Sequence, residues 1–406
     1  MTSPRFLSLF TLFGIAAILL IGAQTSEAQQ HPFEIGLTRL VDTNTAVPGT
    51  FEPFNNFQDA VIDGDRILFA GGVNNANGIF STTLGGPVET VVQDGSLTFF
   101  QGTTFRDLSI SGDEVAFFAN IPFVPGSGLS NGIFVQDLAN NTTRLIVNGN
   151  SLVPGTNRDF DRIDEFAISN GTVVFAGDDS LPPFPQDLFL DQGNGLELIA
   201  SASDVGASGI IDVEIDGSNV FFTTISPGGL FVVDPNGQIT NLVSGSQPDD
   251  LSVSDGNIAF DDGSLTTLVN GQLTDLVSGG DPIPETNDTF ALLEDIALDG
   301  ENIAFFGNDS FNTGNVDGLF AVIDGKVVTL LRENDLLEGQ LVDGFSISSD
   351  AFSDDQIVFT VDFQDGSEAV FLASITSTVP VPSFVMPMMI VLASLLVGRR
   401  RGQIRQ

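Results

Sequence analysis

Carboxylates are the main side chains of this sequence that could do chemistry, because most other reactive types are scarce. The 406 residues include 53 Asp and Glu, no cysteine and a single histidine, His31. Thiol nucleophiles, disulfides and Cys-ligated metals are therefore excluded. His31 stands directly before Pro32, three residues into the mature chain that the signal peptide described below predicts. A free terminus is more often frayed than functional. We therefore expect neither a Ser-His-Asp arrangement nor a His-ligated metal.

Adjacent acidic pairs are the candidates for acid–base catalysis. Two carboxyl groups suffice for glycoside hydrolysis, whereas polysaccharide lyases commonly use Tyr, His or Lys as the base. The sequence has no Tyr, and Lys326 is its one lysine, so it offers few residues that could act as the base of a lyase. Chance and the preference of hairpin turns for Asp also produce such pairs. The pairs near expected strand ends are Asp178-Asp179, Asp249-Asp250, Asp261-Asp262 and Asp354-Asp355.

The acidic composition also limits the partners. A formal net charge of −40 repels nucleic acid and anionic lipid, because phosphate binding needs clustered Lys and Arg. Net charge by itself favours solubility. A second interpretation is association with Ca²⁺, which acidic loops bind through carboxylate oxygens. No Asp-x-Asp-x-Asp-Gly loop occurs, so such a site would have to be assembled from separate loops. We predict no resident cofactor and no nucleic-acid partner.

A unit repeated seven times must position these side chains. Its clearest element is a β-branched residue, one variable residue and a Phe, and it recurs about every 48 residues, in the range of propeller blades. The seven copies are Ile67-Leu68-Phe69, Val115-Ala116-Phe117, Val173-Val174-Phe175, Val220-Phe221-Phe222, Ile258-Ala259-Phe260, Ile303-Ala304-Phe305 and Ile357-Val358-Phe359.

Each copy has similar surroundings. An alternating strand and a turn of Asp, Asn or Gly precede the Phe strand, as in residues 108–112. A third strand follows a variable loop, as in residues 132–134, and a fourth follows as in residues 144–147. In the fifth copy the third strand is degenerate, at residues 263–265. Four short strands joined by hairpins make one blade, so residues 29–374 are predicted to form an all-β, seven-bladed β-propeller with four-stranded blades.

The two ends of the repeat region predict how the ring closes. It opens with a fourth strand (37–41) followed by Val47-Pro48-Gly49-Thr50, an order that recurs at residues 143–156. It ends after a third strand at residues 370–372. The N-terminal strand is therefore predicted to complete the last blade, which would pair backbone groups that an open edge leaves unpaired. A right-handed β-solenoid is the alternative, and it requires no such complementarity between the ends.

The N-terminus has the layout of a secretory signal peptide. Arg5 supplies the positive charge, residues 6–22 are almost entirely apolar, and Ser26-Glu27-Ala28 offers small residues at −3 and −1. This layout predicts cleavage after Ala28, leaving residues 1–28 as the signal peptide. The alternative is an N-terminal anchor that is not cleaved.

The C-terminus has three parts: a Pro-rich linker (375–383), an uncharged apolar segment (384–398) and a basic tail (399–406). Fifteen helical residues span about 22 Å, which is shorter than a bilayer core of about 30 Å. Snorkelling arginines and local thinning of the bilayer would have to compensate for this difference in length. The arginines would stay on the cytoplasmic side. A marginal anchor suits a transient stage in the inner membrane. The alternative is a buried C-terminal helix, against which the prolines and arginines argue.

This tail resembles the PEP-CTERM sorting signals of Gram-negative bacteria. Its motif is Val379-Pro380-Val381-Pro382-Ser383, and its basic cluster is Arg399-Arg400-Arg401. Val381 departs from the family, which usually has Glu there, and this leaves open whether the standard processing enzyme or a variant acts on the chain. The resemblance covers 28 of 406 residues. It implies an exosortase-like membrane protease as a partner and sorting to the cell surface or extracellular matrix, and it implies no activity.

Taken together, the patterns predict an exported, surface- or matrix-sorted, non-enzymatic propeller that acts as an interaction or structural protein of the cell envelope or exopolysaccharide. Its partners would be extracellular polysaccharide or envelope proteins, met by the blade-connecting loops. One alternative is a carboxylate-dependent glycosidase acting on extracellular polysaccharide. The other is a Ca²⁺-dependent adhesin.

Overall fold

The computed structural model describes residues 33–73, 77–94, 102–121, 131–179, 186–309 and 317–377. The predicted signal peptide with Ala28, His31, and the C-terminal sorting motif, apolar segment and arginines all lie outside these residues. Within the described ranges, no helix has the length and apolar character needed to cross a membrane. The chain divides into two units, and the larger one, Ile35–Ser374, contains the fold. Of the smaller unit the structure describes only residues 33–34 and 375–377, which are the ends of two strands.

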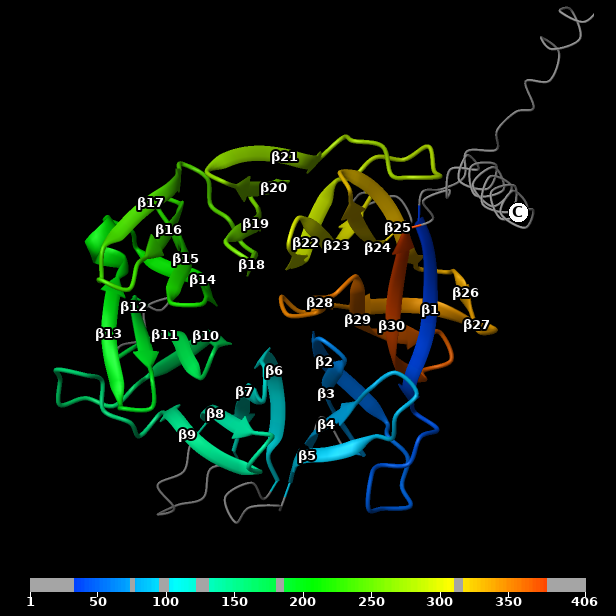
Figure 1. The fold of residues 1–406 in the computed structure, drawn as a ribbon, viewed down its shortest axis with the longest axis horizontal. Coiled ribbons are helices and arrows are strands. Elements are labelled where there is room, and N and C mark those ends of the chain that lie inside the picture. The colour runs from blue at the N-terminus through cyan, green and yellow to red at the C-terminus, as the bar shows by residue number, and fades with distance from the viewer. Residues whose placement is uncertain are drawn as a thin grey trace, which may run out of the picture. The chain divides into compact units, whose positions relative to one another are not determined.

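Seven antiparallel sheets follow one another around a ring in this larger unit (Figure 1), which confirms the predicted seven-bladed propeller. Six of the sheets have four strands in sequence order, counted from the centre outward. The first three are β2 (Asn56–Asp63), β3 (Arg66–Gly72), β4 (Gly78–Thr82) and β5 (Glu89–Gln93); β6 (Thr104–Ser111), β7 (Glu114–Asn120), β8 (Gly132–Asp137) and β9 (Thr142–Asn148); and β10 (Arg162–Ser169), β11 (Thr172–Asp178), β12 (Asp187–Asp191) and β13 (Leu196–Ser201).

The next three blades have the same arrangement. They are β14 (Gly209–Asp216), β15 (Asn219–Ile225), β16 (Gly229–Val233) and β17 (Ile239–Ser244); β18 (Leu251–Ser254), β19 (Asn257–Asp261), β20 (Ser264–Val269) and β21 (Gln272–Ser278); and β22 (Leu292–Asp299), β23 (Asn302–Asn308), β24 (Gly318–Ile323) and β25 (Lys326–Arg332). One short 3-10 helix, η1 (Ala202–Val205), is the single helical element of the described residues.

The repeated Phe builds the core of each blade. All seven copies on the second strands are fully buried, which Phe tolerates because it has no polar group to satisfy. In six blades this ring stacks on a Phe of the third strand, with centroids 5.3–6.1 Å apart. In the fifth blade Phe260 lies opposite Thr266, which is the copy whose third strand is degenerate in sequence. The motif therefore marks packing within a blade, and several of its Phe residues also belong to apolar clusters shared with the neighbouring blade.

The seventh blade departs from the others at its centre. Its innermost strand is split into β27 (Gln340–Ser346) and β28 (Phe352–Ser353), and both pair with β29 (Gln356–Phe363). A short strand β26 (Leu336–Leu337) is added beside β27. The repeat does not predict this split, because its motif is read from the second strand. Residues 347–351 leave the sheet between the two halves.

The N-terminal strand closes the ring as predicted. The order β1 (Phe33–Asp42), β30 (Glu368–Ser377), β29, β27 places the first strand of the chain at the outer edge of the last blade. Beyond the ladder, the backbone N–H of Thr43 donates to the carbonyl of Glu368 at 3.0 Å. The Glu368 side chain in turn accepts from the N–H of Phe57 in the first blade at 2.7 Å.

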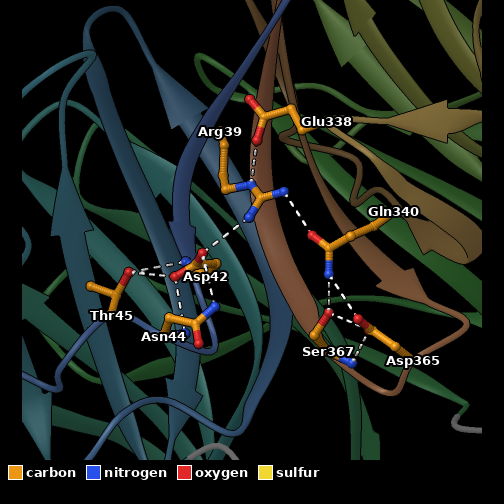
Figure 2. A network of polar contacts seen from close by, with 8 residues as sticks. All are labelled: Arg39, Asp42, Asn44, Thr45, Glu338, Gln340, Asp365 and Ser367. Atoms are coloured by element: carbon orange, nitrogen blue, oxygen red, sulfur yellow. Dashed lines mark hydrogen bonds and ion pairs between the residues drawn. The ribbon is translucent and has the colours of Figure 1, made fainter.

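Arg39 on β1 is the centre of a polar network at this closure (Figure 2). Its guanidinium donates to Asp42 and to Gln340 at 3.0 Å each, and Nε lies 2.9 Å from Oε2 of Glu338. It also lies over the rings of Phe363 and Phe371, 5.6 and 5.5 Å from their centroids. One side chain thus joins β1 to three other strands and one turn of the last blade.

A second set of polar contacts joins every blade to the next. The Asp or Ser at the end of each innermost strand accepts a hydrogen bond from a backbone N–H in the first turn of the following blade, at 2.5–3.2 Å in six of the seven cases. The pairs are Asp63 with Gly112, Ser111 with Asn170, Ser169 with Gly217, Asp216 with Gly256, Ser254 with Gly300, Asp299 with Asp354 and Asp355, and Ser353 with Gly64. We call this set the inter-blade ring.

Replacing Arg39 tests the closure. Arg39→Ala removes charge-assisted hydrogen bonds and two cation–π contacts, so we expect the free energy of unfolding to fall by about 2–4 kcal/mol in chemical denaturation. The matched control is Arg158→Ala, since Arg158 is 70% exposed and makes a single ion pair with Asp179 at 3.6 Å. That variant should lose less than about 1 kcal/mol. Equal losses would show that Arg39 has no special part in closing the ring.

Candidate functional site

Six carboxylates gather around the centre of the propeller, one from each of the first six blades, on its innermost strand or directly before it. They are Asp59, Asp107, Glu165, Asp212, Asp250 and Asp295. Each stands four residues before the Asp or Ser that belongs to the inter-blade ring. In the seventh blade Ser349 has the same spacing from Ser353. We call these six residues the carboxylate ring.

β-Bulges direct most of these carboxylates toward the centre of the ring. The ladder between the first and second strands skips Asp59, Asp107, Glu165 and Asp295, one in each of four blades. A wider gap in the fourth blade contains Asp212. A bulged residue leaves the ladder and its side chain is re-aimed, so the same irregularity repeated around the ring directs acid toward the centre. Asp59, Asp107 and Asp295 have φ of 38°, 52° and 50°, a region that Asp tolerates better than most residues.

The carboxylate ring lies toward one face of the propeller. Because every blade has the same orientation, the innermost strands all begin on the same face and end on the other. The carboxylates lie midway along these strands or, for Asp250, directly before one, and so nearer than the inter-blade ring to the strand beginnings, where the blade-connecting loops arrive. We call this the loop face. The inter-blade ring, at the strand ends, lies toward the opposite face.

Two cavities lie among these side chains. The larger, of about 320 Å³, is lined by members of the carboxylate ring from blades one, two, three and six. The smaller, of about 270 Å³, is lined by members from blades three to six. Ile347, Ser348 and Ser349 line both cavities. Of the described residues that line the two cavities, Arg106 alone is cationic.

Burial and mutual repulsion shift the acidity of these groups. Burial, followed by the charges of Asp107 and Asp164, raises the pKa of Glu165 to about 7. Burial raises the pKa of Asp107 to about 6 against the opposing effect of Arg106, with which Asp107 forms an ion pair. Burial raises the pKa of Asp295 to about 6 as well, with Asp250 contributing. Around the larger cavity Glu165 is therefore partly protonated near neutral pH, whereas Asp107 and Asp295 are mostly ionised.

Burial also raises the pKa of the other three members of the carboxylate ring. Burial raises the pKa of Asp59 and Asp250, although each accepts a backbone hydrogen bond from the next blade, at 2.7 Å from Asp107 and 3.0 Å from Asp295 respectively. Burial also raises the pKa of Asp212 well above its ordinary value, and the charge of Glu165 adds to this effect.

A set of carboxyl groups with unequal acidity has two chemical capacities. A neutral carboxylic acid beside a carboxylate can donate a proton during glycoside hydrolysis. Ionised carboxylates can attract cationic groups. A metal centre is not evident, since no group of three or more acidic or His side chains in the described ranges is placed to hold an ion.

The structure brings one of the four predicted acidic pairs to this site. Asp249 and Asp250 both line the smaller cavity. The other three pairs lie elsewhere: Asp178 ends β11, Asp261 and Asp262 lie at the β19–β20 hairpin, and Asp354 and Asp355 form the β28–β29 turn with φ of 52° and 59°. Lys326 lies exposed at the start of an outer strand.

Sequence reasoning missed five of the six ring members. Only Asp250 belonged to a predicted pair. The signal was present as an acidic residue, three variable residues and then Asp or Ser before the turn. A search for adjacent carboxylates cannot find this pattern, because its members are about one blade apart in the sequence.

Comparisons with known proteins establish the class of fold. No protein-family model and no curated protein sequence matches the chain. The β-propeller domain of the Trilobed protease from Pyrococcus furiosus is similar, with a TM-score of 0.52 and 10% identity over 80% of this chain and 100% of that domain. A structure from a study of two prolyl endopeptidases has a TM-score of 0.50 and 10% identity over 80% of this chain and 50% of that one.

A post-proline cleaving enzyme from Rickettsia typhi has a TM-score of 0.47 and 11% identity over 76% of this chain and 50% of that one. The chain thus spans about half the length of these two peptidase structures. At such identities the likeness shows the fold alone: the protein is a β-propeller.

The raised acidity predicts how stability depends on pH. A carboxyl whose pKa is raised by folding destabilises the native state as pH rises from its ordinary value toward the raised one. For Glu165, Asp107 and Asp295 this loss of stability therefore occurs between about pH 4 and pH 7. We expect the melting temperature to fall across this window and Glu165→Gln to recover about 1 kcal/mol at pH 8, after allowance for solvent in the open cavity.

The control for this measurement is Glu89→Gln, on an exposed position of an outer strand, which should follow the unmodified protein. A melting temperature that rises steadily from pH 5 to pH 8 would contradict the prediction.

Proposed function

We propose that this chain is an exported, non-enzymatic β-propeller that acts through its loop face as an interaction protein of the cell envelope or exopolysaccharide. The observation that carries the proposal is Phe51, whose side chain is entirely exposed at the tip of the β1–β2 connection. Leu336 and Leu152, 70% and 58% exposed, lie on two other blade connections of the same face. Large apolar side chains displayed on loops of one face are typical of binding surfaces.

Local hydrogen bonds hold Phe51 in place. The N–H of Val47 donates to the carbonyl of Glu52 at 2.9 Å, and the hydroxyl of Thr50 donates to the carbonyl of Val47 at 2.9 Å. An isolated bridge joins Ala46 to Pro53. A loop backbone that is ordered before binding loses little conformational entropy on binding, so an ordered loop with an exposed tip favours recognition.

Two other connections have the same hairpin, at residues 152–159 and 282–289. Their turns place Gly49, Gly155 and Glu285 at equivalent positions with φ of 79°, 79° and 63°. Gly meets this left-handed requirement without strain. Glu285 shows that the hairpin geometry is kept even where its preferred residue is absent.

The electrostatics indicate the kind of partner. A net charge of −40 and the carboxylate ring on the same face oppose an anionic polymer. We infer that the partner is a neutral or cationic envelope component, which contacts the apolar tips and is attracted by the acidic centre.

Export and sorting form the second part of the proposal. The apolar N-terminal segment and the tail with Val379, Pro380, Pro382 and Arg399 to Arg401 support passage through the inner membrane and processing by an exosortase-like protease. The cell surface or extracellular matrix is the proposed destination.

Removing the tips of the loop face tests the interaction role. The variant with Phe51→Ser, Leu152→Ser and Leu336→Ser should bind at least about tenfold more weakly to purified envelope and exopolysaccharide fractions in co-sedimentation, since buried apolar contacts dominate such interfaces. The matched control carries Leu145→Ser, Leu198→Ser and Leu273→Ser on outer strands, where these residues are 46–47% exposed. It should bind like the unmodified protein.

Equal binding by both triple variants would contradict the role of the loop face. Release of reducing sugars from the polysaccharide, lost in Glu165→Gln, would instead support the glycosidase alternative, which the shared cavity and the raised pKa of Glu165 favour.

Deleting Arg399 to Arg401 tests the sorting role. In a host that has the cognate protease, the deletion should leave unprocessed full-length protein, because the stop signal that holds the tail in the membrane for cleavage is lost. Arg405→Ala, in the same tail, is the control and should be processed normally. Immunoblots of membrane and culture fractions measure both. Normal maturation of the deletion variant would refute the proposal.

A further inference from the structure

The segment between β27 and β28 crosses the centre of the propeller. In the sixth blade three residues lie between the ladder pairs Glu294–Phe306 and Leu298–Ile303, and the ladder skips one of them, Asp295. In the seventh blade five residues, 347–351, separate the corresponding pairs Ser346–Thr360 and Phe352–Ile357. The seventh blade therefore has two more residues at this point, and they extend the segment toward the centre of the ring. We call residues 347–351 the strap.

The strap is hydrogen-bonded to the first two blades. Oγ of Ser348 donates to the carbonyl of Ala60 at 2.8 Å, and the N–H of Ile62 donates to the carbonyl of Asp350 at 2.9 Å. The Asp350 carboxylate accepts from Oγ of Ser109 at 2.7 Å and from the N–H of Ile110 at 2.9 Å.

The strap also reaches the far side of the ring. Oγ of Ser252 in the fifth blade donates to the carbonyl of Ser349 at 3.3 Å. The side chains of Glu214, in the fourth blade, and Ser349 are hydrogen-bonded. A segment of the seventh blade thus contacts four other blades directly.

Two serines extend these contacts to the remaining blades. Ser109, which donates to Asp350, accepts from the N–H of Ile168 in the third blade at 3.1 Å. Ser252, which donates to the strap, accepts from the N–H of Leu298 in the sixth blade at 3.0 Å. Through single hydroxyl groups the strap is therefore connected to all seven blades.

We propose that the strap is a pH-sensitive tie: a neutral Glu214 holds it across the channel in mild acid, and ionisation of Glu214 beside Asp350 releases it at higher pH. Because residues 347–349 of the strap line both cavities, its release would enlarge them and join them into one cavity at the centre of the ring. This inference does not depend on the proposed interaction role.

The surroundings of Glu214 support this assignment. Its side chain is buried, and burial raises its pKa well above the ordinary value, with the charges of Asp350 and Asp212 adding to the effect. Burial also raises the pKa of Asp350, but the hydrogen bonds from Ser109 and Ile110 oppose this. Hydrogen bonds to a carboxylate favour its ionised form. The hydrogen bonds that Glu214 receives from Ser349 and Ile215 also favour its ionised form, but repulsion from Asp350 and Asp212 outweighs them. Asp350 is therefore expected to ionise first and Glu214 to remain neutral longer.

The other charges near the strap act in the same direction. Each of the first six blades places acidic side chains around the strap, and Arg106 is the one cationic residue among the described residues that line the cavities. The acidic groups are Asp59 and Asp63 on β2, Asp107 on β6, Asp164 and Glu165 on β10, Asp212 and Glu214 on β14, Asp249 and Asp250 beside β18, and Glu294 and Asp295 on β22. As pH rises, each ionisation makes the next more unfavourable and increases the repulsion on Asp350.

Hydrogen exchange measured by mass spectrometry tests the strap. In the unmodified chain we expect protection of the peptide containing residues 347–351, corrected for the intrinsic rate, to fall at least about tenfold from pH 5 to pH 8, the equivalent of one pKa unit. Glu214→Gln keeps the shape and a hydrogen-bonding group but cannot ionise, so its protection should change less than about threefold. Glu197→Gln, exposed on β13, is the matched control and should behave like the unmodified chain.

A second variant and an internal reference make the outcome decisive. Asp350→Asn, which removes the opposing charge, should also flatten the pH dependence and serves if Glu214→Gln does not fold. Peptides from outer strands must keep their protection across the same range, which separates release of the strap from global unfolding. Unchanged protection of the strap in the unmodified chain, or an equal fall in Glu214→Gln, would overturn the proposal.

Discussion

The hydrogen bonds between successive blades are the constraint on which the rest of this propeller depends. A blade buries its own Phe residues, but it does not by itself determine its distance and angle to the next blade. Apolar packing between neighbouring blades brings them together. The Asp or Ser at the end of each innermost strand adds a directional contact, by accepting from a backbone N–H in the first turn of its neighbour. Because each contact fixes one blade relative to the next, seven of them define a closed ring.

The same strands explain why acid gathers at the centre. The inter-blade contacts fix the end of each innermost strand, and in four blades a bulge four residues earlier turns a carboxylate toward the axis. A sevenfold arrangement brings side chains that are distant in the sequence around the same space. Their mutual repulsion and burial then raise their pKa values, an effect that no single blade would produce.

The seventh blade completes the ring in two ways that the other blades do not share. At its outer edge it accepts the first strand of the chain, with Arg39 between the two (Figure 2). At the centre it gives up a continuous innermost strand, and the strap occupies the position where a seventh carboxylate would stand. Ser349 is found at that position, so the strap meets the acidic groups with hydroxyl and backbone groups in place of another charge.

The sequence by itself determined the class of fold, the number of blades and the closure by the first strand. These features follow from local patterns: the recurring Phe motif, the alternating strands and the order of elements at the two ends. Only the tertiary structure decided which carboxylates meet, because the bulges and the strap are small departures from the repeat whose effect depends on ring closure. Asp59 and Asp295 share a cavity although they lie far apart in the sequence. Convergence on an axis is a property of the assembled ring, and no local pattern contains it.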